Sequence, residues 1–197
     1  LSRILGLLLL LQAAAMLGCL AYAIYDQEPD FAADRAMGLS AIITAAAGGL
    51  LSWCGRGSSG EILRREAIGI VGLGWAASTI FGALPYVMST PSLPPAAAIF
   101  ESASGFTTTG ASAIADVEIW PRGLLLWRAT TQWLGGMGIL VLFVAVLTMA
   151  GGGSKSLFRR ESSAKFSEGF SASMQETAVR LWQIYIGLSA LCLFGLI

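Results

Sequence analysis

The sequence lacks histidine altogether and has only three cysteines among its 197 residues. Cys19, Cys54 and Cys192 lie far apart, each within an apolar stretch, so we expect neither a zinc site nor a redox pair. We interpret them as free thiols buried in the fold. No carboxylates, histidine or nucleophile are paired as catalysis requires, which argues against an enzyme.

Charged residues are also scarce. They make up 12% of the chain, against about a quarter in an average soluble domain. Twelve basic and twelve acidic residues cancel, which gives no sign of a nucleic-acid partner. Hydrophobic residues reach 55% and the mean hydropathy is +0.72, so the composition predicts an integral membrane protein.

Five apolar runs approach or exceed the roughly 20 residues that a helix needs to cross a bilayer. They cover residues 4–24, 36–55, 67–88, 124–150 and 181–197. The chain begins with Leu1 and stops inside the fifth run, so we expect it to be part of a longer protein. Arg3 and the Ala21-Tyr22-Ala23 triplet also imitate a signal peptide, an alternative that the length of the first run disfavours.

A different kind of segment separates the third and fourth runs. Pro94-Pro95 suits the first turn of a helix, and the alanines after it favour helix over residues 95–105. At about 1.5 Å per residue, such a helix reaches only about 17 Å, roughly half the hydrocarbon core. It must therefore turn back through residues 106–112. Polar backbone at this depth is tolerated only where protein buries it or where it lines a watery path.

The returning segment carries Thr107, Thr108, Thr109 and Gly110. A row of main-chain carbonyls at Thr108, Thr109 and Gly110 would suit a filter in which carbonyls replace the water shell of a cation. Gly110 can adopt the positive φ that such a row requires. A simple turn is the alternative.

Four further residues are expected to support this loop: Thr107, Ala111, Ser112 and Glu101. Glu101 is a carboxylate at membrane depth, where isolated charge is costly. We expect it behind the loop, accepting hydrogen bonds from backbone N–H groups or a hydroxyl, rather than binding the ion directly.

Arg128 interrupts the fourth apolar run near its start. It either snorkels to the outer interface or ties this helix to the loop through an acidic partner. Glu101, Asp116 and Glu118 are the candidate partners.

Basic residues in short loops indicate the cytoplasmic side of a membrane protein. They gather between runs two and three and between runs four and five, at Arg56, Arg64, Arg65, Lys155, Arg159, Arg160 and Lys165. The opposite side is acidic, with Asp26, Glu28, Asp30, Asp34, Asp116 and Glu118 against Arg35 and Arg122. This asymmetry predicts a cytoplasmic amino terminus and a loop that opens outward, where the acidic residues either concentrate cations or are simply solvated.

The remaining motifs favour structural roles. Glycines at 69, 72 and 74 and at 135, 136 and 138 indicate close helix packing, although the second group could also form a gating hinge. Trp53, Trp120, Trp127 and Trp182 lie near the ends of runs and predict an aromatic belt. Residues 151–156 lack the spacing of a nucleotide-binding loop, and the basic stretch that follows is expected to anchor the chain or to contact a regulatory subunit.

Several of these segments resemble one family. Residues 100–111 (FESASGFTTTGA) closely resemble the first pore loop of the Trk/Ktr/HKT potassium transporters, specifically the bacterial Trk membrane subunit. Residues 128–139 (RATTQWLGGMGI) resemble the family's first inner helix, and residues 82–85 the end of its first outer helix. Residues 176–185 resemble the start of the second outer helix, so the likeness covers essentially the whole chain.

The resemblance implies an all-α membrane fold in which four repeats of outer helix, pore helix, filter and inner helix surround one pore. Residues 1–60 would form an extra amino-terminal helix pair. Residues 61–154 would form the first repeat, with spans at 67–88 and 122–150, a pore helix at 95–105 and a filter at 106–112. Residues 155–197 would be a cytoplasmic linker and the first helix of the second repeat.

The resemblance also implies K⁺ uptake across a bacterial inner (plasma) membrane, with Thr108, Thr109 and Gly110 as K⁺ ligands and no organic cofactor. A homodimer in membrane lipid and a cytoplasmic nucleotide-binding regulatory subunit are the implied partners. Only one glycine of the potassium-channel signature TVGYG is kept, which implies looser discrimination against Na⁺. A transporter that couples K⁺ to Na⁺ or H⁺, and a non-conducting scaffold, are the alternatives.

Overall fold

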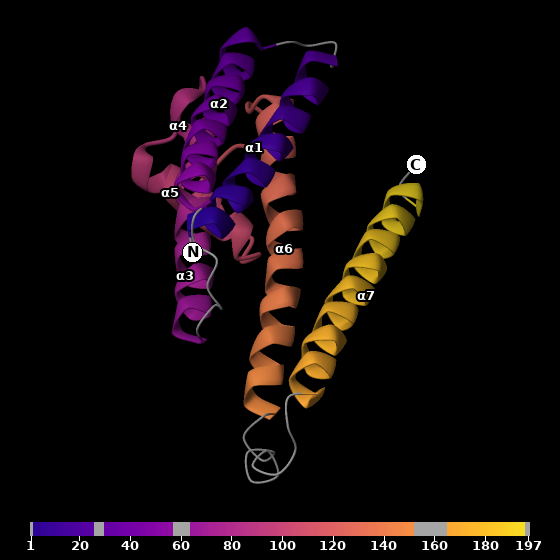
Figure 1. Ribbon diagram of the computed structural model, residues 1–197. Coiled ribbons are helices and arrows are strands. Elements are labelled where there is room, and N and C mark those ends of the chain that lie inside the picture. The colour runs from indigo at the N-terminus through magenta and orange to yellow at the C-terminus, as the bar shows by residue number, and fades with distance from the viewer. Residues whose placement is uncertain (1, 26–29, 57–63, 152–164, 196–197) are drawn as a thin grey trace. The chain divides into compact units, whose positions relative to one another are not determined.

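The computed structural model describes residues 2–25, 30–56, 64–151 and 165–195, and within these ranges it contains helices and no strand. The helices are α1 (Ser2–Tyr25), α2 (Phe31–Cys54), α3 (Arg64–Gly82), α4 (Leu84–Met88), α5 (Pro95–Phe106), α6 (Arg122–Gly151) and α7 (Lys165–Gly195) (Figure 1). The predicted all-α membrane fold is confirmed.

Among the described residues, four helical segments are long and apolar enough to cross a membrane. They are Ser2–Tyr25, Phe31–Cys54, Gly69–Met88 and Glu176–Gly195, and they overlap four of the five predicted runs. The remaining run lies in α6, a continuous helix of 30 residues. The basic stretch at 155–164 and all but the first residue of 151–156 lie outside the described residues.

The chain divides into two compact units, Leu1–Leu134 and Gly135–Ile197. The first unit contains α1 to α5 and the beginning of α6, and the second contains the rest of α6 with α7. The loop that follows α5 therefore belongs wholly to the first unit.

Within the first unit, α1 packs along α2 (Figure 1). Small residues allow the two backbones to approach closely, as in other membrane helix pairs. A Cβ atom added to Gly6 would lie 2.5 Å from the Ser52 nitrogen and 2.6 Å from the Gly48 carbonyl oxygen. Asp30 starts α2 as its N-cap, accepting hydrogen bonds from the backbone N–H groups of Ala32 and Ala33.

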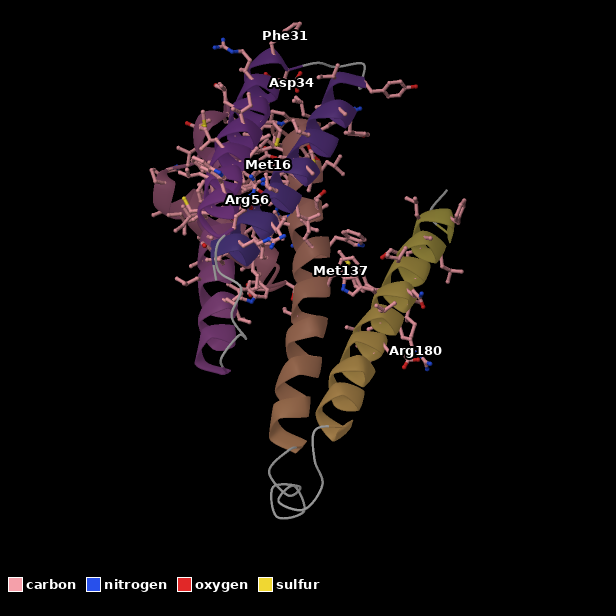
Figure 2. All side chains as sticks on the ribbon, viewed as in Figure 1. Met16, Phe31, Asp34, Arg56, Met137 and Arg180 are labelled. Carbon is pink, nitrogen blue, oxygen red and sulfur yellow. The ribbon has the colours of Figure 1, made fainter. Side chains whose placement is uncertain are left out.

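The core of the first unit lies among α1, α2, α4, α5 and the start of α6. Met16, labelled in Figure 2, is fully buried there. Two of the four tryptophans expected at the membrane surface also belong to this core, since Trp127 is 0% and Trp120 is 7% exposed. The aromatic-belt prediction is therefore wrong for these two, because both rings pack against other aromatic residues inside the protein. Trp53 and Trp182 are exposed, as such a belt requires.

The three cysteines are free, but only Cys19 is buried. Cys54 and Cys192 are exposed, so the prediction that all three thiols are buried is wrong. An apolar run in a membrane helix need not face protein, because lipid tails are as apolar as a protein core.

The glycines of the predicted packing positions also differ among themselves. A Cβ on Gly136 would lie 2.6 Å from the Tyr185 hydroxyl oxygen, and one on Gly74 would make an ordinary contact with Leu8. Gly69 and Gly72 have nothing within 4 Å of that position, so close packing does not explain them in the described part of the chain.

Candidate functional site

The site begins where α5 ends. Beyond Phe106 the chain leaves the helix as an exposed, irregular segment over residues 107–113. The Thr108 N–H donates to the Gly105 carbonyl (2.9 Å) and the Thr109 N–H donates to the Ser104 carbonyl (3.0 Å). This pair of bonds is the Schellman motif that often ends a helix.

The Schellman motif requires one residue in the left-handed backbone region, and that residue is usually glycine. Here it is Thr108, with φ +56°, the single non-glycine residue with positive φ in the described ranges. Gly110, two residues later, has φ +76°. A strained, β-branched residue persists only where its surroundings dictate the conformation, and such residues cluster at functional sites.

Among residues 107–113, the Ala111 carbonyl alone accepts a hydrogen bond from a residue that the structure describes. The carbonyls of Thr108, Thr109 and Gly110 accept no hydrogen bond from any residue that the structure describes. The Ala111 carbonyl, in contrast, accepts a hydrogen bond from Ser104 Oγ at 2.5 Å. The three carbonyls predicted from the sequence thus accept no hydrogen bond from the described residues, and the same is true of the Thr107, Ser112 and Ala113 carbonyls.

Hydroxyl groups stiffen the start of the loop. Thr107 Oγ1 donates to the Ala103 carbonyl at 2.7 Å and lies 2.8 Å from Thr109 Oγ1. These bonds connect two loop side chains to the last turn of α5. Thr107 is thus tied to α5 at the start of the loop.

Glu101 holds the far end of the loop. Its side chain is 1% exposed, and its carboxylate accepts hydrogen bonds from Ser112 Oγ (3.1 Å) and the Ala113 N–H (2.8 Å). Arg128 Nε forms an ion pair with the other carboxylate oxygen at 2.5 Å. Of the three candidate partners for Arg128, the structure shows Glu101, and the snorkelling alternative is wrong.

A buried carboxylate is costly unless it is paired and hydrogen-bonded, and Glu101 is both. One of its oxygens is paired with Arg128 of α6 and the other accepts hydrogen bonds from the loop. The Glu101 side chain therefore connects α6 to the loop. Asp116 and Glu118 are instead exposed, and Asp116 accepts the backbone N–H of Glu118. No group of three Cys, Asp or Glu side chains in the described ranges is arranged to hold a metal ion.

Two further residues position the loop and were not identified from the sequence. Gly105 lies directly against Thr131 of α6, so that a Cβ on Gly105 would lie 3.0 Å from the Thr131 Cβ and closer still to its hydroxyl. Thr131 is fully buried and donates its hydroxyl hydrogen to the Arg128 carbonyl. The only sequence signal was a glycine within α5, and nothing in one sequence indicates which helix fills the space it leaves.

Comparison with known proteins places this geometry in a family. Residues 35–197 match the TrkH family, described as a cation transport protein. The Trk system potassium uptake protein TrkH of Escherichia coli (strain K12) is 37% identical over 199 residues, covering 99% of this chain and 40% of that protein. The protein of the same name from Halomonas elongata is 35% identical over 192 residues, covering 96% of this chain and 39% of that protein.

Comparison of the fold with solved structures points to the same family. The crystal structure of the potassium transporter TrkH from Vibrio parahaemolyticus matches with a TM-score of 0.78 and 31% identity, over 96% of this chain and 37% of that one. The chain thus spans about 40% of the length of the curated relatives that it matches. With four segments able to cross a membrane, it is a multi-pass membrane protein. The resemblance seen in the pore-loop and inner-helix motifs is confirmed, and the chain belongs to the TrkH family of cation transport proteins.

Proposed function

We propose that this chain contributes to K⁺ uptake by a full-length transporter, and that residues 107–112 form one part of its ion filter. The observation that carries this proposal is a loop tied down at both ends in which the Thr108, Thr109 and Gly110 carbonyls accept no hydrogen bond from the described residues. Carbonyl oxygens of this kind can replace the hydration shell of K⁺.

The way the loop is held supports this role. A filter requires fixed oxygen positions, and the loop is fixed at both ends. Ser104 and the Schellman bonds hold its start, and Glu101 holds Ser112 and Ala113. Thr107, Ala111, Ser112 and Glu101 are therefore assigned supporting roles, while direct contact with K⁺ is assigned to Thr108, Thr109 and Gly110.

The helices fit the repeat organisation that the family resemblance implies. In this proposal, α1 and α2 are an amino-terminal pair within residues 1–60. Helices α3 to α6, with the filter, form the first pore repeat over residues 61–154. Helix α7, within residues 155–197, opens the second repeat. Four such repeats would supply four filter segments around one axis.

We also propose that the protein lies in a bacterial plasma membrane with its amino terminus in the cytoplasm and the filter open to the exterior. A membrane potential that is negative inside then drives K⁺ inward by about 2.3 kcal/mol per charge for every 100 mV. The proposed assembly is a homodimer with a cytoplasmic nucleotide-binding subunit that regulates it.

Coupled transport with Na⁺ or H⁺ is the main competing function. It requires a second ion site or a titrating group within the membrane region. Glu101 is a buried carboxylate, and its oxygens are already engaged by Arg128, Ser112 and Ala113. This saturation favours a channel-like path over coupling through Glu101.

The proposal is tested with Gly110→Ser in the full-length protein, expressed in a strain that requires external potassium. A serine at φ +76° is strained, so the loop should shift and K⁺ uptake should fall or lose its preference over Na⁺. Gly49→Ser is the matched control, because nothing lies within 4 Å of a Cβ there. Unchanged uptake and an unchanged K⁺/Na⁺ ratio in Gly110→Ser would rule out the filter and favour a scaffold role.

A further inference from the structure

The helix breaks between α3 and α4, and this break leaves the Gly82 backbone carbonyl without its usual N–H donor. Helix α3 ends at Gly82 and α4 begins at Leu84, with Pro85 in its first turn. The Tyr86 N–H donates to the Ala83 carbonyl at 3.1 Å, three residues back, instead of to Gly82. Because proline disrupts the regular ladder here, the Gly82 carbonyl must find a donor outside the helix.

That donor is Trp127 of α6. Its indole Nε1–H donates to the Gly82 carbonyl at 3.0 Å, across 45 residues of sequence, and the side chain is fully buried. A buried indole N–H and a buried carbonyl are both costly when unpaired. The single hydrogen bond between them satisfies both groups and fixes the plane of the indole ring.

The same indole contacts the last residue before the loop. The Phe106 and Trp127 rings pack edge to face, with centroids 6.4 Å apart and an interplanar angle of 77°. The broken end of α3 also presses on α5, since a Cβ on Gly82 would lie 2.6 Å from Ser102 Oγ and 2.7 Å from the Phe106 ring. Phe106 is therefore held between Trp127 and Gly82.

We infer that Trp127 is a positioning residue for the filter, acting through Phe106. The N–H anchors the indole to the end of the outer helix, the indole anchors Phe106, and the loop begins at the next residue. This inference rests on the proposed filter role of residues 107–112 and deepens it, because it names a residue outside the loop that sets where the carbonyls stand.

The test is Trp127→Phe in the full-length protein, reconstituted in proteoliposomes, with K⁺ and Na⁺ uptake rates measured separately. Phenylalanine keeps an aromatic ring but removes the N–H. We expect the ratio of the K⁺ to the Na⁺ uptake rate to fall about fivefold. This is the change in an equilibrium constant that the loss of one buried hydrogen bond typically causes. Trp53→Phe is the control, because Trp53 is exposed on α2, and its ratio should equal that of the wild type.

Gly82→Ala provides a second route that leaves the indole intact. Its methyl group would push on Ser102 and Phe106, so the ratio should fall as well. If Trp127→Phe does not fold, the K⁺/Na⁺ uptake ratio of Gly82→Ala tests the inference by itself. Slower uptake at the wild-type ratio in both variants would indicate a purely structural role and overturn the inference.

Gly110→Ser separates this inference from the filter proposal. Gly110→Ser can change the K⁺/Na⁺ uptake ratio while Trp127→Phe and Gly82→Ala keep the wild-type value. That result would support the filter proposal and contradict the positioning role of Trp127. If Gly110→Ser also keeps the ratio, the filter proposal fails and the positioning role fails with it.

Discussion

Thr108 has an unusual backbone conformation for a β-branched residue. Its backbone is in the left-handed region, which costs a non-glycine residue about 1–3 kcal/mol. Its carbonyl also accepts no hydrogen bond from the described residues. Glycine would relieve the strain but would also release φ. A threonine held in this conformation suits a loop in which the directions of the carbonyls matter.

Ser104 ties one carbonyl of the loop to α5. Its hydroxyl donates to the carbonyl of Ala111, the residue directly after Gly110. We expect Ser104→Ala to release that carbonyl, to remove a bond worth about 0.5–1.5 kcal/mol and to lower the K⁺/Na⁺ uptake ratio. Uptake of both ions in proteoliposomes measures the effect.

Ser92→Ala serves as the control for this prediction, since Ser92 is exposed in the loop before α5. A Ser104→Ala protein that folds normally and keeps the wild-type ratio would show that the Ala111 carbonyl has no influence on selectivity.

At the scale of the helices, α1 holds the first unit together. It packs closely against α2 through Gly6, and Cys19 lies 3.5 Å from the Thr130 hydroxyl of α6. Gln12 donates from the middle of α1 to the Ser78 carbonyl of α3 at 3.2 Å. Polar and small residues of this kind hold membrane helices together where no hydrophobic force distinguishes protein from lipid.

Two glycines of α1 provide a matched pair of variants. Gly6→Ala places a methyl group on the backbone of α2, and such overpacking typically costs about 1–3 kcal/mol. Gly18→Ala meets nothing within 4 Å and should be neutral, or stabilising by up to about 1 kcal/mol through helix propensity. Thermal unfolding of the purified full-length protein in detergent should show a lower Tm for Gly6→Ala alone. Equal Tm values for the two variants would contradict the close α1–α2 contact.

At the scale of the whole chain, apolar side chains cover much of the exposed helix surface. Leu7, Leu11, Ile42 and Leu191 are all more than half exposed, as expected where helices face lipid. Charge is arranged differently. The ion pair of Glu101 and Arg128 lies within the membrane-spanning unit, whereas charges such as Asp30, Asp34, Arg56 and Arg122 lie at or near helix ends.

The orientation proposed for the chain can be tested with single cysteines. Glu118 and Arg56 are both exposed and fall on opposite sides in the proposed topology. In a full-length protein freed of its native cysteines, a thiol reagent that cannot cross the membrane should label Glu118→Cys in intact cells. Arg56→Cys should react only after the cells are permeabilised, because basic loops remain in the cytoplasm. Labelling of the two sites in the reverse order would contradict this topology.

The sequence by itself determined the features that depend on local chemistry. Apolar runs of sufficient length specified membrane helices, because the bilayer sets how many residues a helix needs. Pro94-Pro95, the alanines that follow and the polar run after them specified a short helix that ends in an irregular segment. The positive φ of Gly110 follows in the same way from the freedom of a residue without a side chain.

Only the tertiary structure decided which residues meet. It selected Glu101 over Asp116 and Glu118 as the partner of Arg128, and it buried Trp127, which was expected at the membrane surface. The physical reason is that lipid and protein core are equally apolar, so hydropathy reports that a helix lies in the membrane but not which of its faces meets protein. Contacts between residues far apart in the chain, such as Trp127 with Gly82, settle that question through packing and hydrogen bonds.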